Sequence, residues 1–352
     1  MITLTKGNLI EANAEALVNS VNCEGYMGKG IALQFKKAFP ENFKSYQRAC
    51  RAGEIRPGWM FVYPTGSMVN PRYIINFPTK RQWRAKSKLE DIRAGLEALV
   101  EEVRDRRIGS IAVPPLGCGL GGLNWREVKP IIEHAFAELP QVCVLLFEPA
   151  GAPAAKAMPV RTRRPKMTLA RALLIRLMRQ YTELAHRLTL LEVQKLAYFL
   201  QESREPLRLK YVKHLYGPYA HNLNKVLETL DGHFIRGYGD SQAPDAEIEL
   251  VPAAIEEADQ FLASSPESRA RLERVAEVID SFETPYGMEL IASVHWVALH
   301  ETPPVMTADE AVRAVQDWSD RKRTIFKPAH IRVAWERLHQ LGWLPVAEGE
   351  RR

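Results

Sequence analysis

Two glycine-rich segments carry the clearest chemical signal in this 352-residue sequence. The first spans residues 19–30, NSVNCEGYMGKG, and the second spans residues 114–124, PPLGCGLGGLN. Each follows a short apolar run and precedes a helical pattern, so we expect each to join a strand to a helix. Glycines let backbone N–H groups crowd around an anion, and the helix N-terminus adds a favourable dipole. Two such loops at equivalent strand ends predict a cradle for a diphosphate group.

The two loops do not indicate a nucleoside triphosphatase, because neither contains the GKS or GKT ending of a P-loop. We also expect no metal site, since no HxxxH pair or carboxylate cluster supplies a set of metal ligands. A pair of carboxylates for ordinary glycoside hydrolysis is not evident either. The chemistry must therefore come from another kind of residue.

Lys80 is the candidate, and it follows the strand-like run at residues 73–77. A lysine with a lowered pKa can attack carbon as a nucleophile, whereas a protonated lysine can stabilise negative charge on a leaving group. The alternative is a solvated surface lysine, because Lys80 belongs to a basic cluster that also contains Arg81, Arg84, Lys86 and Lys88.

Alternating strand and helix patterns across residues 1–150 predict the α/β domain that would position these groups. Strand patterns lie at residues 2–4, 16–21, 59–63, 73–77, 111–113 and 142–147, and helical patterns lie at residues 30–38, 88–107 and 124–137. In such a fold the ligand site lies at the carboxyl ends of the strands. Both glycine-rich loops and Lys80 are expected at that edge.

Residues 1–150 resemble a macrodomain, the ADP-ribose-binding module. The matching segments are Lys6-Gly7-Asn8-Leu9, the VNSVN segment at residues 18–22, the loop at residues 25–32 and the loop at residues 115–123. The resemblance is closest to the terminal ADP-ribose glycohydrolase branch, which has a catalytic lysine just after a strand, at the place of Lys80. It implies a three-layer α/β/α domain with a mixed central sheet. It also implies that ADP-ribose is a ligand or product, and that no cofactor is needed.

The resemblance also implies roles for individual residues. Lys80 and Asn22 would be the catalytic residues, with Asn22 orienting the hydroxyls of the distal ribose. The residues that bind ADP-ribose would be Asn8, Leu9, Asn19, Gly28, Lys29, Gly30, Ile31, Thr79, Pro115, Gly117, Cys118, Gly119, Leu120, Gly121, Gly122 and Leu123.

Two positions depart from the family pattern. Asn8 stands where many macrodomains have an aspartate that binds the adenine amino group. Gly121 stands where the human-type glycohydrolase of this branch has an aspartate that pairs with its lysine. Two functions therefore stay open: a hydrolase that uses Lys80, and a macrodomain that binds ADP-ribose without cleaving it.

The terminal glycohydrolase branch includes the DarG-type antitoxins, which remove ADP-ribose from DNA bases. This implies ADP-ribosylated single-stranded DNA as the substrate, with thymidine as the modified base. Residues of the basic cluster would bind DNA: Arg81, Arg84 and Lys86 through phosphates, and Trp83 by stacking on an unpaired base. Trp83 could instead cap the hydrophobic core.

The charge divides unevenly along the chain. Residues 1–150 hold 20 basic and 15 acidic residues, whereas residues 168–352 hold 23 basic and 27 acidic residues. Residues 151–167, GAPAAKAMPVRTRRPKM, hold five basic residues and no acidic one. The composition of this middle segment is typical of a linker, either a solvated tether or a segment that attracts phosphates. We therefore expect domains at residues 1–150 and 168–352.

Residues 168–352 show mainly helical patterns. The stretches LLEVQKLAYFLQ and HLYGPYAHNLNKVLETL resemble the helical core of phage-associated antitoxin domains. The resemblance implies that this domain binds and neutralises a toxin, which in a DarG-type system is a DarT-like ADP-ribosyltransferase acting on single-stranded DNA. Such a toxin needs a basic DNA groove, and the net charge of −4 on residues 168–352 has the complementary sign.

The remaining features indicate a cytoplasmic protein. No apolar run has the length of a membrane span, and the N-terminus lacks the pattern of a signal peptide. The four cysteines, Cys23, Cys50, Cys118 and Cys143, form no CxxC pair, so we expect neither a disulfide framework nor a structural zinc site.

Overall fold

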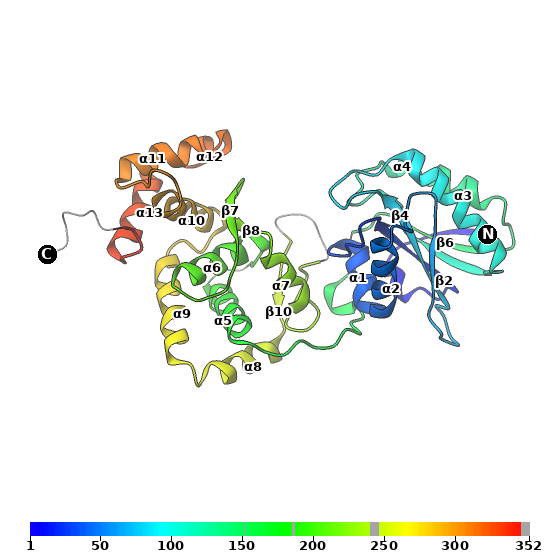
Figure 1. Ribbon diagram of the computed structural model, residues 1–352, viewed down its shortest axis with the longest axis horizontal. Helices are drawn as coiled ribbons and strands as arrows, with labels where there is room; N and C mark the ends of the chain where they lie inside the picture. The colour runs from blue at the N-terminus through cyan, green and yellow to red at the C-terminus, as the bar shows by residue number, and fades with distance from the viewer. Residues whose placement is uncertain (152, 185–186, 240–245, 346–352) are drawn as a thin grey trace. The chain divides into compact units, whose positions relative to one another are not determined.

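The computed structural model describes residues 1–345 except 152, 185–186 and 240–245 (Figure 1). The chain divides into two compact units. The first contains residues 1–164, and the second contains residues 165–238 with the described residues that follow 245. In the described part of the chain, no helix combines the length and the apolar character that crossing a membrane requires.

A six-stranded sheet forms the centre of the first unit. Its strand order is β1-β6-β5-β2-β4-β3, and its strands are β1 (Ile2–Thr5), β2 (Ala16–Asn22), β3 (Phe61–Pro64), β4 (Tyr73–Lys80), β5 (Ser110–Val113) and β6 (Cys143–Phe147). The edge strand β3 pairs antiparallel with β4, and every other pairing is parallel. The carboxyl ends of the five parallel strands therefore meet at one edge, where the loops that follow them gather.

Helices cover both faces of this sheet: α1 (Gly30–Ala38), α2 (Pro40–Arg51), α3 (Leu89–Asp105) and α4 (Trp125–Phe136). Alternate residues of β2 point to opposite faces. Ala16 and Val18 pack in one core with residues of α3 and α4, whereas Leu17 packs in another core with Phe35 of α1. Figure 1 shows α3 and α4 on the opposite side of the sheet from α1 and α2. The expected three-layer α/β/α fold with a mixed sheet is confirmed.

The sequence analysis missed one helix and shortened one strand. Pro40 was expected only to end a helix, but it is also the first residue of α2, where its missing N–H costs nothing. Strand β4 continues to Lys80, three residues beyond the expected end, and all but its first residue are buried. Lys80 is therefore the last residue of a buried strand and not part of a surface turn.

The described part of the linker packs on the first unit. Residues 155–157 form a short 3₁₀ turn, and the carbonyl of Ala157 accepts a hydrogen bond from Asn8 Nδ2 at 3.4 Å. The backbone N–H of Arg161 donates to the carbonyl of Lys37 at 2.9 Å, and its guanidinium lies 5.5 Å from the ring centre of Phe39. The expectation of a solvated tether therefore does not hold for residues 155–161.

The second unit is mainly helical, as expected. Its helices are α5 (Leu169–Leu184), α6 (Leu190–Glu202), α7 (Leu223–Leu230), α8 (Pro252–Leu262), α9 (Pro266–Ile279), α10 (Pro285–Leu299), α11 (Ala308–Asp317), α12 (Asp320–Ile325) and α13 (Pro328–Gln340). A hairpin of β7 (Tyr211–His214) and β8 (Gly217–Ala220) and a short pair, β9 (Ile235–Arg236) with β10 (Glu249–Leu250), complete it. Helix α10 is buried along most of its length and lies at the centre of this unit's core.

Buried polar contacts explain why the two antitoxin-like stretches occur together. Gln194 of α6 accepts a hydrogen bond from the backbone N–H of Ala220 at 2.9 Å and donates to its carbonyl at 3.2 Å. Lys195 donates to the carbonyl of Pro218 at 2.8 Å, inside the YGP turn. Because both side chains are buried, these bonds fix the hairpin to the helix at low dielectric.

Candidate functional site

The carboxyl ends of β2 and β4 bring the two proposed catalytic residues together. In the parallel register of these strands Asn22 pairs with Lys80, after an irregularity at Val21 and Asn22. The backbone N–H of Cys23 then donates to the carbonyl of Lys80 at 3.1 Å. The first glycine-rich loop therefore begins directly beside Lys80.

Lys80 also contacts the second glycine-rich loop. Its Nζ donates to the carbonyl of Leu120 at 3.0 Å and to the carbonyl of Trp83 at 3.4 Å. The residue is only 8% exposed, so it is not the solvated lysine of the alternative interpretation. Burial lowers the pKa of Lys80 because it disfavours the charged form. Both partners are carbonyl oxygens, which accept hydrogen bonds from an ammonium or from a neutral amine.

The side chain of Asn22 holds the first loop in shape. Its Oδ1 accepts hydrogen bonds from the backbone N–H groups of Glu24 and Tyr26 at 3.1 and 3.2 Å, and its Nδ2 donates to the carbonyl of Tyr26 at 2.6 Å. Tyr46 donates to the backbone carbonyl of Asn22 at 2.7 Å from the other side. Asn22 thus fixes the position of Tyr26, while its contact with a ribose stays a prediction.

Asn19 lies beneath the first loop and not in it. It is fully buried, and its Nδ2 donates to Asn76 Oδ1 at 2.9 Å and approaches Met27 Sδ at 3.8 Å. Asn42 and Asn76 exchange hydrogen bonds in the same buried network. The expected contact of this side chain with ADP-ribose is therefore corrected: Asn19 supports the loop from the interior.

Two further predicted binding residues also turn their side chains inward. Thr79 is 2% exposed, and its hydroxyl contacts the carbonyl of Val21 at 3.3 Å and Ser20 Oγ at 3.0 Å. Leu9 is 4% exposed and packs in the core beside α1. Strand alternation and core packing place these side chains in the interior, so they position the site without lining it.

The second loop turns sharply enough to require glycine at two points. Gly117 and Gly122 have φ angles of +71° and +73°, a region that L side chains rarely adopt. Backbone bonds from Gly122 N to Gly119 O and from Leu123 N to Gly117 O close the turn. Cys118 lies within it, and burial raises the pKa of its thiol to about 11, so the thiol is not a ready nucleophile.

Gly121 has a packing reason that the sequence did not reveal. A Cβ at this position would lie 2.1 Å from Ser87 Oγ and 2.3 Å from the carbonyl oxygen of Gly117. The backbone N–H of Ser87 donates to the carbonyl of Gly121 at 3.0 Å, which fixes this close approach. An aspartate cannot occupy position 121 in this backbone arrangement, so the acidic partner of the family pattern is excluded by sterics.

The other predicted ligand residues lie at the start of α1 and after β1. Lys29 is the residue before α1, and burial lowers its pKa. Gly30 begins that helix with a φ of +58°. Asn8 caps the 3₁₀ turn at Leu9–Glu11 by accepting a hydrogen bond from Ile10 N at 3.1 Å. Gly28 and Lys29 thus lead into the N-terminus of α1, the arrangement that favours an anion.

An exposed aromatic and basic rim borders Lys80. Trp83 is 47% exposed and Tyr26 is 55% exposed, and their ring centres are 6.0 Å apart. The guanidinium of Arg84 lies 4.5 Å from the ring centre of Trp83, and Glu24 accepts a hydrogen bond from the Trp83 backbone N–H at 2.7 Å. Trp83 therefore does not cap the core. Tyr26 was missed by the sequence analysis, although an aromatic residue inside a glycine-rich loop was a usable signal.

The basic residues of the rim are not equivalent. Arg81 forms an ion pair with Asp91 of α3 at 3.1 Å, which offsets its charge. Lys88 pairs with Glu90 at 3.2 Å. Arg84 and Lys86 are exposed. Arg84 and Lys86 are therefore better placed than Arg81 to meet a phosphate.

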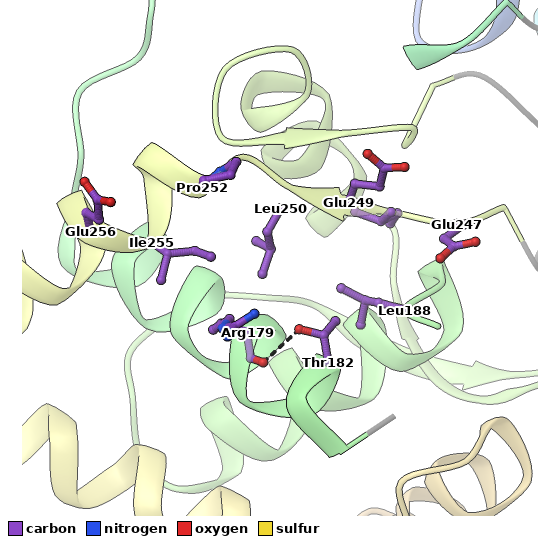
Figure 2. Close-up of a pocket in the computed structure, with 10 residues that line it drawn as sticks. Arg179, Thr182, Leu188, Glu247, Glu249, Leu250, Pro252, Ile255 and Glu256 are labelled. Carbon is purple, nitrogen blue, oxygen red and sulfur yellow. Dashed lines mark hydrogen bonds between the residues drawn. The ribbon is translucent and has the colours of Figure 1, made fainter. Parts of the chain in front are cut away.

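A separate cavity of about 580 Å³ lies in the second unit, between α5, β10 and α8 (Figure 2). Leu188, Leu250 and Ile255 give it an apolar floor, and Glu247 and Glu256 lie at its border. None of its lining residues is a predicted site residue. Across the described residues, no group of His, Cys, Asp and Glu side chains could hold a metal ion.

Comparison with known proteins places these observations in a family. The model of the Macro domain family matches residues 18–132. A DNA ADP-ribosyl glycohydrolase of Thermus aquaticus is 45% identical and covers 100% of this chain, which spans 97% of that relative. A fusion protein of a DNA ADP-ribosyl transferase and a DNA ADP-ribosyl glycohydrolase from Thermosipho africanus is 32% identical over 42% of each chain. The solved macrodomain of Mycobacterium tuberculosis DarG is 53% identical, covers 43% of this chain and 99% of its own, and has a TM-score of 0.42.

Proposed function

The chain belongs to the DarG-type family of DNA ADP-ribosyl glycohydrolases, and from this premise we propose that it removes ADP-ribose from thymidine in single-stranded DNA. The bond that breaks joins C1″ of the distal ribose to a nitrogen of the base. Water supplies a hydroxyl to C1″ and a proton to the base, so the products are free ADP-ribose and unmodified DNA.

The position of Lys80 is the observation that carries this proposal. The amine lies at the carboxyl edge of the sheet, beside the start of one glycine-rich loop and hydrogen-bonded to the other. Burial lowers its pKa and so raises the fraction of neutral amine at a given pH. We assign Lys80 as the nucleophile: the amine attacks C1″, the base leaves with the bonding electrons and takes a proton, and water then releases ADP-ribose from the lysine.

Borohydride trapping tests this assignment of Lys80. A ribose joined to a lysine amine opens to an imine, which borohydride reduces to a stable covalent adduct. We expect an adduct of ADP-ribose on Lys80, located by mass spectrometry of peptides, when the full chain turns over modified DNA. Active protein that yields no adduct would favour the other role of Lys80, in which its ammonium stabilises the leaving base.

A macrodomain that only binds ADP-ribose was the alternative. Its support was the glycine at position 121, where the family pattern has an acid. Because Gly121 is required by the close approach of Ser87 and Gly117, its presence carries no argument against catalysis. The hydrolase is therefore the function that we propose.

The rim supports single-stranded DNA as the carrier of the modified base. Exposed Trp83 and Tyr26 offer faces on which an unpaired base can stack, and Arg84 adds a cation beside them. A duplex would keep its bases stacked on one another and out of reach of these rings. We expect the rim to hold the nucleotides next to the modified thymidine.

A panel of single-stranded oligonucleotides tests the choice of base. Each oligonucleotide carries one ADP-ribose, on thymidine in one set and on another base in the others, and free ADP-ribose is followed by chromatography. We expect release from modified thymidine at least about tenfold faster than from the other bases. Release only from another base would overturn the thymidine assignment and leave the hydrolysis standing, whereas no release from any oligonucleotide would overturn the proposed function.

We also propose that residues 165–352 bind a DarT-like ADP-ribosyltransferase toxin. The fusion relative supports a link between the two activities, since its name joins a transferase and a glycohydrolase in one chain. The excess of acidic residues in 168–352 has the sign that a basic DNA groove would attract.

Direct binding can be measured without interference from hydrolysis. The full chain carrying Lys80→Ala is titrated with the toxin at increasing salt, with and without single-stranded DNA. We expect binding that weakens with salt and that DNA displaces. Binding that ignores both salt and DNA would contradict docking on the DNA groove, and no binding would contradict direct neutralisation.

A further inference from the structure

Ser87 is a buried polar residue that neither the family pattern nor the proposed chemistry uses. It precedes α3 at the end of the rim segment that follows Lys80, and it is 6% exposed. Its Oγ is buried and has no hydrogen-bond partner among the residues that the structure describes. Most buried hydroxyls in proteins are hydrogen-bonded, so an unpartnered hydroxyl needs an explanation.

The surroundings of this hydroxyl point to the second glycine-rich loop. Ser87 Oγ lies 2.1 Å from the place that a Cβ of Gly121 would take and 3.3 Å from the corresponding place at Gly117. The serine hydroxyl therefore fills the space in which the family pattern puts the side chain of residue 121. It brings a polar atom there from a different segment of the chain.

Ser87 and Lys80 also fix the same stretch of the loop. Lys80 Nζ donates to the carbonyl of Leu120 at 3.0 Å, and the backbone N–H of Ser87 donates to the next carbonyl, that of Gly121, at 3.0 Å. The segment from 80 to 87 is thus held to the loop at consecutive peptide groups. A hydroxyl in this position can meet a ligand oxygen while the amine of Lys80 meets C1″.

We propose that the Ser87 hydroxyl donates a hydrogen bond to an oxygen of ADP-ribose held by residues 117–122, and so positions the distal ribose for Lys80. This inference rests on the proposed function and deepens it. Ser87 is a positioning residue in this account, because bond breaking is assigned to Lys80. A neutral hydroxyl can hold an anionic diphosphate or a ribose oxygen without adding a negative charge beside either.

Two substitutions separate a ligand contact from a structural role. Ser87→Ala removes the hydroxyl, and Ser87→Cys keeps a similar volume with a weak hydrogen-bond donor. Ser110→Ala is the matched control: Ser110 Oγ accepts a hydrogen bond from the backbone N–H of Glu15 at 2.9 Å, and Ser110 opens β5. Each full-length variant is measured for the Kd of free ADP-ribose by calorimetry and for its melting temperature.

We expect Ser87→Ala and Ser87→Cys to weaken ADP-ribose binding about tenfold, with a melting temperature equal to or above that of the unaltered protein. Removing an unpartnered hydroxyl costs the folded protein no hydrogen bond. Ser110→Ala should do the opposite, lowering the melting temperature and leaving Kd unchanged. Equal Kd for Ser87→Ala and the unaltered protein would overturn the proposal, and so would full binding by Ser87→Cys, since volume alone would then suffice.

Failure of this inference differs from failure of the proposed function. If the unaltered protein binds ADP-ribose but releases none from DNA, hydrolysis fails while the Ser87 comparison still decides the ligand contact. If release from DNA is normal and the Ser87 variants bind as well as the unaltered protein, only the Ser87 assignment fails. Absence of ADP-ribose binding by the unaltered protein overturns both.

Discussion

Lys80 combines burial with two carbonyl partners, and this combination sets the expected response to pH. Burial lowers its pKa below the ordinary lysine value of about 10.4. As a nucleophile it reacts as the neutral amine, so kcat should rise with pH up to the lowered pKa and then level off. An ammonium that stabilises the leaving group would give the opposite slope.

A pH profile of kcat for release of ADP-ribose from modified DNA measures that slope. The companion variant is Lys80→Arg, which keeps the positive charge at every accessible pH because arginine does not deprotonate in proteins. We expect it to lose at least about a hundredfold in kcat. A rate that falls as pH rises, with Lys80→Arg retaining activity, would contradict the nucleophile.

Gly121 yields a second prediction at the scale of one residue. Gly121→Ala should push apart Ser87 and the carbonyl of Gly117, weaken ADP-ribose binding at least about tenfold and lower the melting temperature. Gly119→Ala is the control, because a Cβ there would meet no atom within 4 Å and the backbone is not left-handed. Equal tolerance of both changes, measured by calorimetry and thermal melting, would show that the loop does not need glycine at 121.

Sequence reasoning found some site residues and misplaced others for a physical reason. Lys80 and the two loops were predictable because strand ends and glycine spacing are local properties. Asn19 and Thr79 were expected to face ADP-ribose, but a parallel strand buried on both faces turns every side chain inward, so alternation gives no signal. The link from Ser87 to Gly121 joins residues 34 positions apart, and no local pattern reports it.

The rim is an element of its own, formed by the loop between β4 and α3 together with Tyr26. Trp83→Ala and Arg84→Ala should lower kcat/KM for ADP-ribosylated oligonucleotides about tenfold each, because base stacking and a phosphate contact are lost. The Kd of free ADP-ribose should stay unchanged. Arg84→Ala should also reduce the salt dependence of DNA binding by about one unit of the log–log slope.

Another arginine–tryptophan pair supplies the control. Trp59 is 54% exposed, and the guanidinium of Arg56 lies 4.8 Å from its ring centre, before β3. Trp59→Ala should leave kcat/KM on DNA unchanged. An equal loss from Trp59→Ala and Trp83→Ala would deny the rim a specific role.

The elements themselves were predictable to different degrees. Helix α3 was expected from its apolar stripe, and its residues Ile92, Leu96 and Leu99 are buried as that stripe requires. Helix α2 was missed because Pro40 was taken only as a helix end, although proline is equally suited to the first turn of the next helix. Proline alone could not separate the two cases.

For the whole molecule, the division of charge is the most informative property of the sequence. The net charge of +6 combines a basic segment of residues 1–167 with an excess of acidic residues in 168–352. The sequence could indicate this division, but it could not show that residues 155–161 pack on the first unit through Asn8, Lys37 and Phe39. Those contacts join residues more than a hundred positions apart.

One measurement tests the central claim most directly. A single-stranded oligonucleotide with one ADP-ribosylated thymidine is incubated with the full chain, with Lys80→Ala and with Lys44→Ala, and free ADP-ribose is quantified over time. Lys44 is the control because it is an exposed lysine of α2, paired with Glu41. We predict rapid release by the unaltered protein and by Lys44→Ala, and a loss of at least about a thousandfold for Lys80→Ala. No release by the unaltered protein, or equal release by Lys80→Ala, would contradict the account.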